Sequence, residues 1–471
     1  MFGIMLAMFL GALDQTIVAT ALPTIGRALH DVDDLPWVVT AYLLTSTAVT
    51  PLYGKLSDIH GRRAMLLVSI ALFLLGSFAC AVAPSMLALI LARGLQGIGG
   101  GGLISLAQTV IADVVAPKER ARYQATIASV FVASSIAGPI LGGVFAEHLH
   151  WSMIFWINLP LGVAALTLLL PKMAKIPLYH RHRKVDWLGG VLLMASAVVV
   201  MLVLTWGGNR LAWLSPTILS MVGAAVALAL SFVWYARRAE EPFLPLPLLG
   251  GTVVPYAIAA GGCALGAIMG LTVHLPLYYE VVYRLNPSEA GLALIPLAAI
   301  STCGAAIAGR TMARARRYKR VAILGTLLAV VSGFAMALAT LPLWGLLVVM
   351  SVFALGLGTA FPVSVVSLQN SVARAQIGTL TGAMNFFRAL MASFTVAAFT
   401  AILLMALGSD IQLAGEHRGS VGSIAASDMI AAFRWVFGAA ALMMVCAAAC
   451  LIAMEERPLA GPATPPAEPA E

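Results

Sequence analysis

Long uncharged apolar runs dominate the pattern of hydrophobic and polar positions along the chain. One transmembrane α-helix needs about 20 mostly apolar residues, and the run 64–84 is uncharged and almost wholly apolar. A transmembrane β-barrel would instead alternate polar and apolar residues over segments of about ten, so the pattern predicts an all-α integral membrane protein. Fourteen spans are expected at residues 1–25, 36–54, 64–84, 86–111, 122–146, 152–171, 186–206, 214–236, 251–280, 288–309, 320–342, 344–368, 378–405 and 430–454.

Positively charged residues fall mainly on one side of these spans. The chain has 28 Lys and Arg against 20 Asp and Glu, a formal net charge of +8. If the N-terminus starts inside, 21 of the 28 basic residues lie on the cytoplasmic side and 5 lie outside, while Arg93 and Arg388 lie within spans. This distribution follows the positive-inside rule. It predicts that both termini are cytoplasmic, and it attributes the basic charge to topology and not to a nucleic-acid partner.

The composition and the long connections indicate the domain organisation. Of the 471 residues, 61% are hydrophobic and 10% are charged, which leaves no room for a soluble catalytic domain. The connections 172–186 and 237–250 bracket two spans, and removing that pair leaves six spans on either side. We therefore expect an N-terminal six-helix bundle at 1–172, two inserted helices with their linkers at 173–249, a C-terminal six-helix bundle at 250–455, and a disordered tail at 456–471 that is rich in Pro, Ala and Glu.

Two further interpretations concern processing and metals. A signal peptide is an alternative interpretation of residues 1–25, but no Lys or Arg precedes the apolar run. The five cysteines lie in spans or at their ends, with no CxxC motif and no His at metal-binding spacing. The sequence therefore predicts neither a disulfide framework nor a metal site.

Short motifs in one loop and four spans carry a resemblance to a known family. The motifs are Gly54, Asp58, Gly61, Arg62 and Arg63 after the second span, the run LDQTIV at 13–18 in the first, Arg93, Gln96 and Gly97 in the fourth, Gly138, Pro139, Gly142 and Gly143 in the fifth, and FWINLP at 155–160 in the sixth. Over about residues 1–455 the chain resembles the major facilitator superfamily, and it is similar to its 14-span drug:proton antiporters. Ile59, Ser134 and Ser152 depart from the usual motifs.

The resemblance implies two six-helix bundles plus two inserted helices and export by alternating access. It implies a multi-pass protein of the bacterial cytoplasmic membrane, driven by the proton motive force without a cofactor. The expected partners are membrane lipids and a small-molecule substrate, with a periplasmic adaptor and an outer-membrane channel if the source is Gram-negative.

Asp14 is the only acidic residue well inside a predicted span. A charged side chain at mid-bilayer costs roughly 2.5–3.5 kcal/mol on insertion scales, so a partner, water or a proton must offset it. At a rise of 1.5 Å per residue, Asp14 and Arg93 differ in depth by about 7 Å, which an arginine side chain can bridge. We predict that the two residues couple proton uptake to transport in a shared substrate cavity, together with Gln96, Asn385 and Arg388. The alternatives are an acid that only holds helices together and an Arg93 that only bonds helix carbonyls.

Two glycine-containing motifs suggest moving or closely packed parts. Gly54 and Gly61 permit tight turns, and Asp58 suits a helix N-terminus, whose dipole attracts an anion. The resemblance implies that Asp58 caps the helix beginning near 378 when the cytoplasmic side is closed; the alternative is a basic turn that only sets topology. We expect Gly138 and Pro139 to break the fifth span, and the small face that they form with Gly142 and Gly143 to seal the two halves against leakage.

These observations favour proton-coupled export of hydrophobic or cationic compounds. Export of one native lipid, siderophore or metabolite is the alternative within transport. A non-transporting membrane sensor should carry a soluble output domain, and an enzyme should place clusters of His, Cys and acids in its spans. The sequence shows neither feature.

Overall fold

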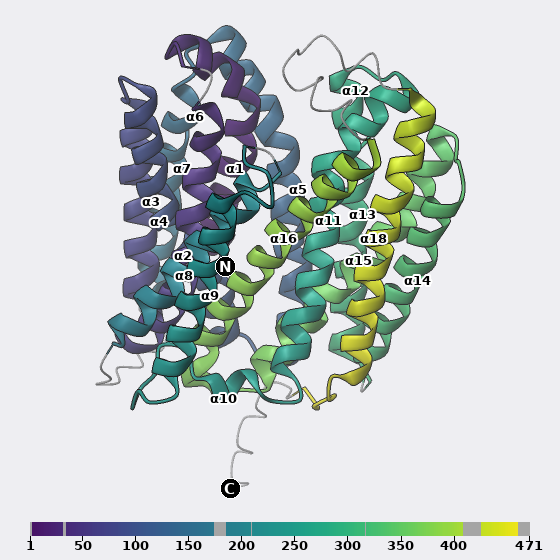
Figure 1. The fold of residues 1–471 in the computed structure, drawn as a ribbon. Coiled ribbons are helices and arrows are strands. Elements are labelled where there is room, and N and C mark those ends of the chain that lie inside the picture. The colour runs from purple at the N-terminus through teal and green to yellow at the C-terminus, as the bar shows by residue number, and fades with distance from the viewer. Residues whose placement is uncertain are drawn as a thin grey trace, which may run out of the picture.

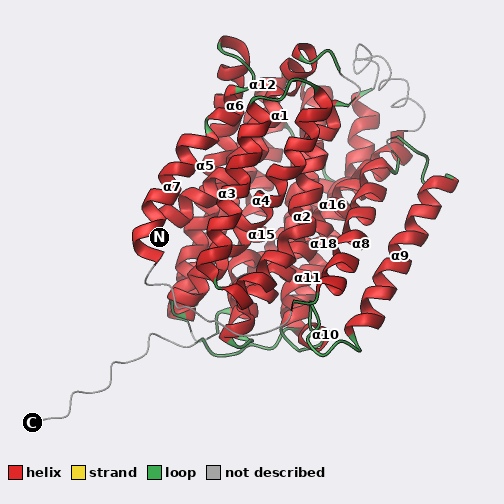
Figure 2. Ribbon diagram, turned by 90° about the vertical axis from the view of Figure 1, so that its left-hand side faces the viewer, coloured by secondary structure: helices red, strands yellow, loops and turns green. Residues whose placement is uncertain are grey.

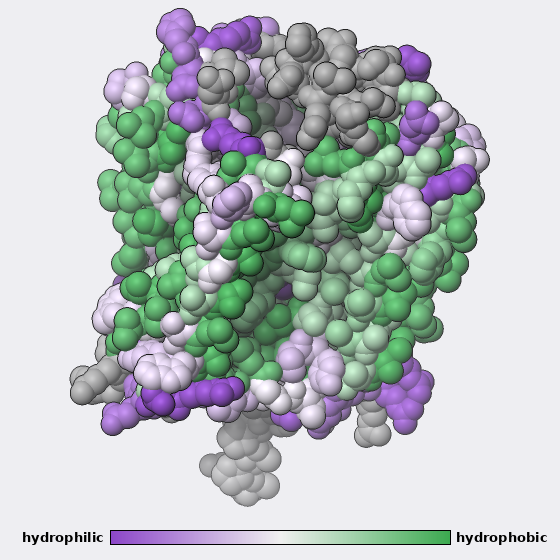
Figure 3. All heavy atoms as spheres, in the orientation of Figure 1, coloured by the Kyte–Doolittle hydropathy of each residue, from purple (hydrophilic) through white to green (hydrophobic). Residues whose placement is uncertain are grey.

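The computed structural model describes residues 2–31, 34–173, 185–208, 210–315, 317–407 and 425–459. Within these ranges there are fourteen candidate membrane spans, and the secondary structure consists of helices without a β-strand. The spans run roughly side by side (Figure 2), and a band of apolar side chains covers the middle of the visible face, with polar side chains gathered toward the two ends (Figure 3). The protein is therefore a multi-pass α-helical membrane protein.

The first bundle forms the purple and blue half of Figure 1. Local sequence explains several helix boundaries: the Ser85 hydroxyl accepts a hydrogen bond from the amide of Ala88 at the start of α4, and Pro117 occupies the first turn of α5, where its missing N–H has no cost. The helices are α1 (Phe2–Ala28), α2 (Leu35–His60), α3 (Arg62–Ala81), α4 (Met86–Val114), α5 (Pro117–His148), α6 (Met153–Trp156) and α7 (Asn158–Met173).

The second bundle forms the green and yellow half of Figure 1. Asn286 and Glu289 form a capping box at the start of α12, in which each side chain bonds the backbone N–H of the other. One apolar core holds this bundle together, with members from Val253 to Leu459. The helices are α11 (Val254–Tyr283), α12 (Pro287–Leu292), α13 (Ile295–Arg314), α14 (Lys319–Leu338), α15 (Leu343–Asn370), the 3₁₀ turn η1 (Arg374–Gln376), α16 (Ile377–Leu407) and α18 (Ala426–Ala453).

The inserted pair, α8 (Trp187–Trp206) and α9 (Pro216–Ala236), lies outside the two bundles (Figures 1 and 2). A short helix, α10 (Leu246–Leu249), follows it. α8 contacts both α2 of the first bundle and α16 of the second. Phe243 and Leu244, which follow α9, are buried in an apolar cluster with residues of α8, α9 and α16. The pair is therefore attached to both halves.

Two helix pairs make the most extensive contacts between the bundles: α2 with α16, and α5 with α13. Both pairs combine one helix from each half of the chain. Any relative movement of the bundles must change the packing of at least one of these pairs.

Three features differ from the sequence interpretation. α5 is continuous through Pro139, so the predicted break of the fifth span is wrong: a proline removes one hydrogen bond and bends a helix, but the helix continues on both sides. The segment 54–60 belongs to α2, so the predicted loop is mainly helical. Residues 457–459 of the predicted tail contact the second bundle, as in the bond from the Tyr318 hydroxyl to the Arg457 carbonyl, at 3.0 Å; residues 460–471 lie outside the described ranges.

Candidate functional site

The Asp14 cluster consists of Asp14 on α1, Ser77 on α3, Arg93 and Gln96 on α4, and Asn158 on α7. Arg93 Nη1 lies 2.6 Å from Asp14 Oδ2, and Gln96 Nε2 donates to Asp14 Oδ1 at 2.7 Å. Asn158 Nδ2 donates to the same Oδ1 at 3.1 Å. The carboxylate therefore has one cation and two amide donors, and the cluster joins four helices at one point.

Arg93 is held by more than its ion pair. Its Nε donates to the Val38 carbonyl of α2 at 3.0 Å, Nη1 also donates to Gln96 Oε1 at 2.6 Å, and the guanidinium lies 4.3 Å from the centre of the Tyr42 ring. Tyr42 also belongs to α2. One guanidinium thus links α1, α2 and α4.

The Asp14 cluster is closed to its surroundings. Asp14 and Gln96 have no exposed surface, and Arg93 is 1% exposed. The prediction that Asp14 and Arg93 lie in contact is confirmed. Helices enclose both side chains in this structure, and the shared substrate cavity stays a prediction.

The contacts among Asp58, Arg62, Gly378 and Thr379, called the gate cluster below, join the first bundle to the N-terminus of α16. Asp58 Oδ1 accepts from the Gly378 amide at 3.1 Å, and Oδ2 accepts from the Thr379 amide at 2.6 Å and the Thr379 hydroxyl at 2.5 Å. A carboxylate at this position satisfies free helix amides and complements the helix dipole. The contact between Asp58 and 378–379 that the family resemblance implied is present.

Arg62 connects Asp58 to a second acid. Its Nη1 forms an ion pair with Asp58, and its Nε lies 2.8 Å from Asp113 Oδ2 at the end of α4. Burial lowers the pKa of the nearby Arg120, which precedes the fifth span, to about 10. Arg63 is half-buried, and no hydrogen bond or ion pair joins it to the described part of the chain.

The two glycines of this motif have different roles. Gly61 lies between α2 and α3 with φ +92°, a conformation that favours glycine. The predicted turn at Gly61 is confirmed. Gly54 lies inside α2, and a Cβ there would come within 2.4 Å of the Gly378 carbonyl oxygen. The predicted turn at Gly54 is therefore wrong: its missing side chain lets α2 and α16 approach closely.

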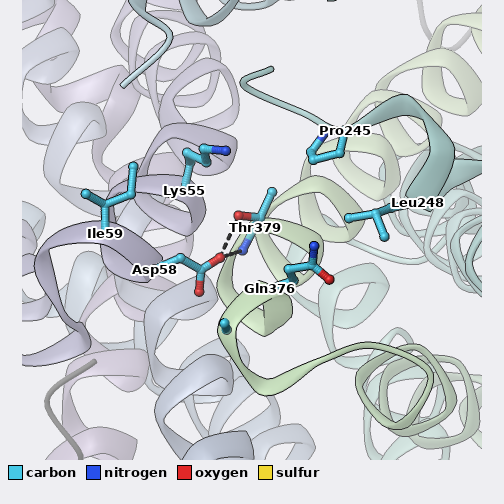
Figure 4. Close-up of a pocket in the computed structure, with 8 residues that line it drawn as sticks. Lys55, Asp58, Ile59, Pro245, Leu248, Gln376 and Thr379 are labelled. Carbon is cyan, nitrogen blue, oxygen red and sulfur yellow. Dashed lines mark hydrogen bonds between the residues drawn. The ribbon is translucent and has the colours of Figure 1, made fainter. Parts of the chain in front are cut away.

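The segment 242–248, which follows α9 and is called the strap below, lies beside the gate cluster. Lys55 Nζ donates to the Pro242 carbonyl at 3.0 Å, and the Phe243 amide donates to Asp186 Oδ2, just before α8, at 2.9 Å. A small cavity of about 20 Å³ lies between Lys55, Asp58, Thr379 and the Pro245 to Leu248 segment (Figure 4). The residues around Asp58 thus contact the segment after α9 as well as both bundles.

The glycine motif of α5 packs within the first bundle. A Cβ on Gly138 would come within 2.0 Å of Thr16 Oγ1, and one on Gly142 within 2.1 Å of Thr20 Oγ1, both on α1. A Cβ on Gly143 would meet nothing within 4 Å. Gly138 and Gly142 therefore let α5 and α1 approach closely within one bundle, and the predicted seal between the two halves stays a prediction.

Asn385 and Arg388 of α16 lie apart from the Asp14 cluster. Asn385 Nδ2 donates to Gln108 Oε1 of α4 at 2.9 Å and so crosses between the bundles. Arg388 is 7% exposed and lies over the Phe361 ring of α15 at 5.0 Å. The five predicted cavity residues therefore form two groups, because sequence depth does not fix which way each helix face turns.

Sequence reasoning missed four partners in these clusters: Ser77, Asn158, Gln108 and Asp113. Asn158 stands in the quoted FWINLP motif, which was a usable signal. Asp113 lies at a helix end, where an acid is usually solvated, and Ser77 and Gln108 are polar residues that also occur in ordinary helix packing.

The fold and these clusters define a class: α-helical membrane transporters built from two bundles. The proton:xylose symporter XylE bound to 6-bromo-6-deoxy-D-glucose superposes with a TM-score of 0.60 at 16% identity, over 95% of this chain and 94% of that one. A bacterial homologue of iron transporter ferroportin in outward-facing state gives 0.60 at 13% identity, over 95% and 98%. These likenesses establish the fold.

Residues 4–396 match the family described as Major Facilitator Superfamily. Multidrug resistance protein 3 of Bacillus subtilis is 30% identical over 430 residues, 91% of this chain and 84% of that protein. The multidrug transporter protein MdtP of the same species is 32% identical over 409 residues, 85% and 74%. An uncharacterized MFS-type transporter of Mycobacterium tuberculosis is 34% identical over 410 residues, and this chain spans only 58% of its length. The chain belongs to the major facilitator superfamily.

Proposed function

We propose that the protein is a proton-coupled antiporter that exports hydrophobic or cationic drugs and other toxic compounds across the bacterial cytoplasmic membrane. The observation that carries the proposal is the buried Asp14–Arg93 ion pair in a chain related to multidrug resistance protein 3 and MdtP. A charged side chain inside a membrane span is costly unless an opposite charge offsets it. Here Arg93 offsets Asp14, and Asp14 is one carboxylate that a proton can neutralise.

Protonation of Asp14 would release Arg93 from α1. The remaining strong contacts of the guanidinium are Gln96 on its own helix and, on α2, the Val38 carbonyl and the Tyr42 ring. The O–H of a protonated Asp14 also needs a hydrogen-bond acceptor. Asn158 Oδ1 has no hydrogen-bond partner among the described residues, and a half-turn of that amide would bring it to Asp14. Proton uptake would therefore shift the attachment of Arg93 from α1 to α2.

α2 also carries Asp58 of the gate cluster. α2 contacts Arg93 near its start and holds Asp58 near its end, where Asp58 caps α16. A change in how Arg93 holds α2 is thus transmitted along a rigid helix to the contact between the bundles. In this scheme the Asp58 end is cytoplasmic and closed, and opening it breaks three donor contacts to Asp58.

The proton motive force supplies the energy. A proton that enters while a neutral compound leaves releases about 2.3 kcal/mol per 100 mV of membrane potential, whereas exchange of one proton for one monovalent cation moves no net charge and is driven by the pH gradient. A substrate cation could approach Asp14 only by displacing Arg93, so substrate and proton compete for one carboxylate.

The test uses purified protein in liposomes with a pH-sensitive dye inside and a panel of cationic and neutral fluorescent drugs, lipids and metabolites. We expect the wild type to move protons when drug is added, and we expect Asp14→Asn to abolish this proton movement. Asp428→Asn is the matched control, because Asp428 is exposed at the start of α18. Full proton-coupled export by Asp14→Asn would overturn the proposal. A response to one lipid or metabolite alone would instead favour a dedicated exporter.

A further inference from the structure

α16 carries a buried cation, Arg388, that has no counter-charge among the described residues. Arg388 is 7% exposed, and neither a hydrogen bond nor an ion pair joins it to any described residue; its Nε is buried and unpartnered. The guanidinium lies over the Phe361 ring, 5.0 Å from the ring centre. Buried charges are normally paired, because removing an ion from water costs several kcal/mol. Arg93 illustrates the normal case, with an acid and a carbonyl as partners.

A second unpartnered polar group lies at the same place. The Ser364 hydroxyl on α15 is fully buried and has no hydrogen-bond partner among the described residues. A Cβ built on Gly261 of α11 would lie 3.2 Å from Arg388 Nε and 3.4 Å from Ser364 Cβ. The Arg388 guanidinium and the Ser364 side chain therefore lie on either side of one position, next to the backbone of α11 at Gly261.

The chemistry of these groups selects an anion. A guanidinium offers only donors, and a serine hydroxyl can donate to an acceptor. Hydrogen bonds from a charged donor to a carboxylate are roughly twice as strong as neutral ones. We propose that Arg388 and Ser364 form a binding site for one small anionic group between α11, α15 and α16, and that this site lets the transporter accept monoanionic amphiphiles.

The proposal rests on the proposed export function and extends its substrate class. The Asp14 cluster is electrically compensated, whereas the Arg388 site in the other bundle has one positive charge to offer. The ligand's anionic group has two sources: a carboxylate of the transported molecule, or a free halide ion.

The experiment measures binding to the purified full-length protein in detergent, by energy transfer from tryptophan to pyrene. The probes are pyrenebutyrate, its neutral methyl ester, and a pyrenylbutyl trimethylammonium cation. We expect Arg388→Gln to weaken pyrenebutyrate binding by about 10-fold to 100-fold, the range for a hydrogen bond to a charged group, and to leave the ester unchanged. Gly261→Ala, which places a methyl group between the two donors, should act in the same direction.

Controls keep the interpretation specific. Arg310→Gln removes an exposed arginine of α13 and should change none of the three affinities. Arg388→Lys retains the charge and should recover part of the preference for the carboxylate, and Ser364→Ala should cost about 3-fold to 10-fold. A thermal unfolding curve for each variant excludes loss of folding as the cause.

A chloride titration separates the two sources. If chloride competes with pyrenebutyrate in the wild type and not in Arg388→Gln, the site also takes a free halide. If chloride has no effect while the carboxylate preference depends on Arg388, the site serves the substrate alone. Equal binding of all three probes by wild type and Arg388→Gln, without a chloride effect, overturns the proposal. Because binding is measured without a proton gradient, this outcome is independent of the Asp14→Asn transport test.

Discussion

Gly54→Ala should open the gate cluster without weakening the fold. The added methyl carbon would lie 2.4 Å from the Gly378 carbonyl oxygen and 3.2 Å from the Gly382 Cα. Real side-chain carbons do not approach backbone oxygen so closely, so α2 and α16 must separate. Gly54 is helical, and alanine is intrinsically better than glycine in a helix by about 1 kcal/mol.

The magnitude follows from the bonds that the separation breaks. Asp58 accepts from the Gly378 amide at 3.1 Å and from the Thr379 amide at 2.6 Å. Hydrogen bonds to a charged group contribute about 1.5–3 kcal/mol each, so losing these two amide bonds alone costs the closed form about 3–6 kcal/mol, and loss of the bond from the Thr379 hydroxyl adds to that cost. At 1.4 kcal/mol per tenfold, this lowers the ratio of closed to open molecules by roughly 10² to 10⁴.

Single-molecule energy transfer can measure that ratio. Dyes on cysteines at Ala64 and Ala373, both exposed near the gate on opposite bundles, report its opening in a background without the five native cysteines. Gly143→Ala is the matched control, because its Cβ would meet nothing within 4 Å. The reasoning fails if Gly54→Ala shows the same distance distribution as wild type and as Gly143→Ala.

Two further predictions concern ion pairs of very different exposure. Arg93→Gln leaves Asp14 without a counter-charge in a buried site, so it should destabilise the protein by about 3–5 kcal/mol, and adding Asp14→Asn should restore most of the thermal stability in detergent; a double variant no more stable than the single one would contradict this. At the exposed end of α18, hydrogen bonds from Thr252 and Arg457 lower the pKa of Glu455, so that contact is present above the ordinary carboxyl range and is lost as pH falls through the lowered pKa. Thr252→Val should therefore raise the pKa of Glu455 in a carbon-13 NMR titration, and an unchanged titration curve would show that the Thr252 bond has no such effect.

The helical architecture could be predicted because burial in lipid constrains every residue of a span. Apolar length located the fourteen spans, and the family resemblance linked Asp58 to the start of α16. Depth arithmetic brought Asp14 to Arg93 because the two helices turn out to be neighbours in one bundle.

Helix rotation and local bending could not be predicted in the same way. Arg388 has a suitable depth, but its side chain turns toward α11 and α15 and away from the first bundle. Pro139 is compatible with a break or a bend, and only the structure shows that α5 continues through it. Asp113 appeared to be an ordinary helix-end acid because its partner Arg62 comes from a different helix.

The inserted pair has a mechanical consequence. α8 touches α2 on one side and α16 on the other, and the strap with Phe243 fastens it close to the point where these two helices meet. If the halves separate at this end, as the proposed cycle requires, α8 cannot follow both neighbours and must slide along one of them. The resistance of that sliding surface would affect the turnover rate, so substitutions on the faces of α8 and α9 that carry no ionisable group can make the proposed cycle faster or slower.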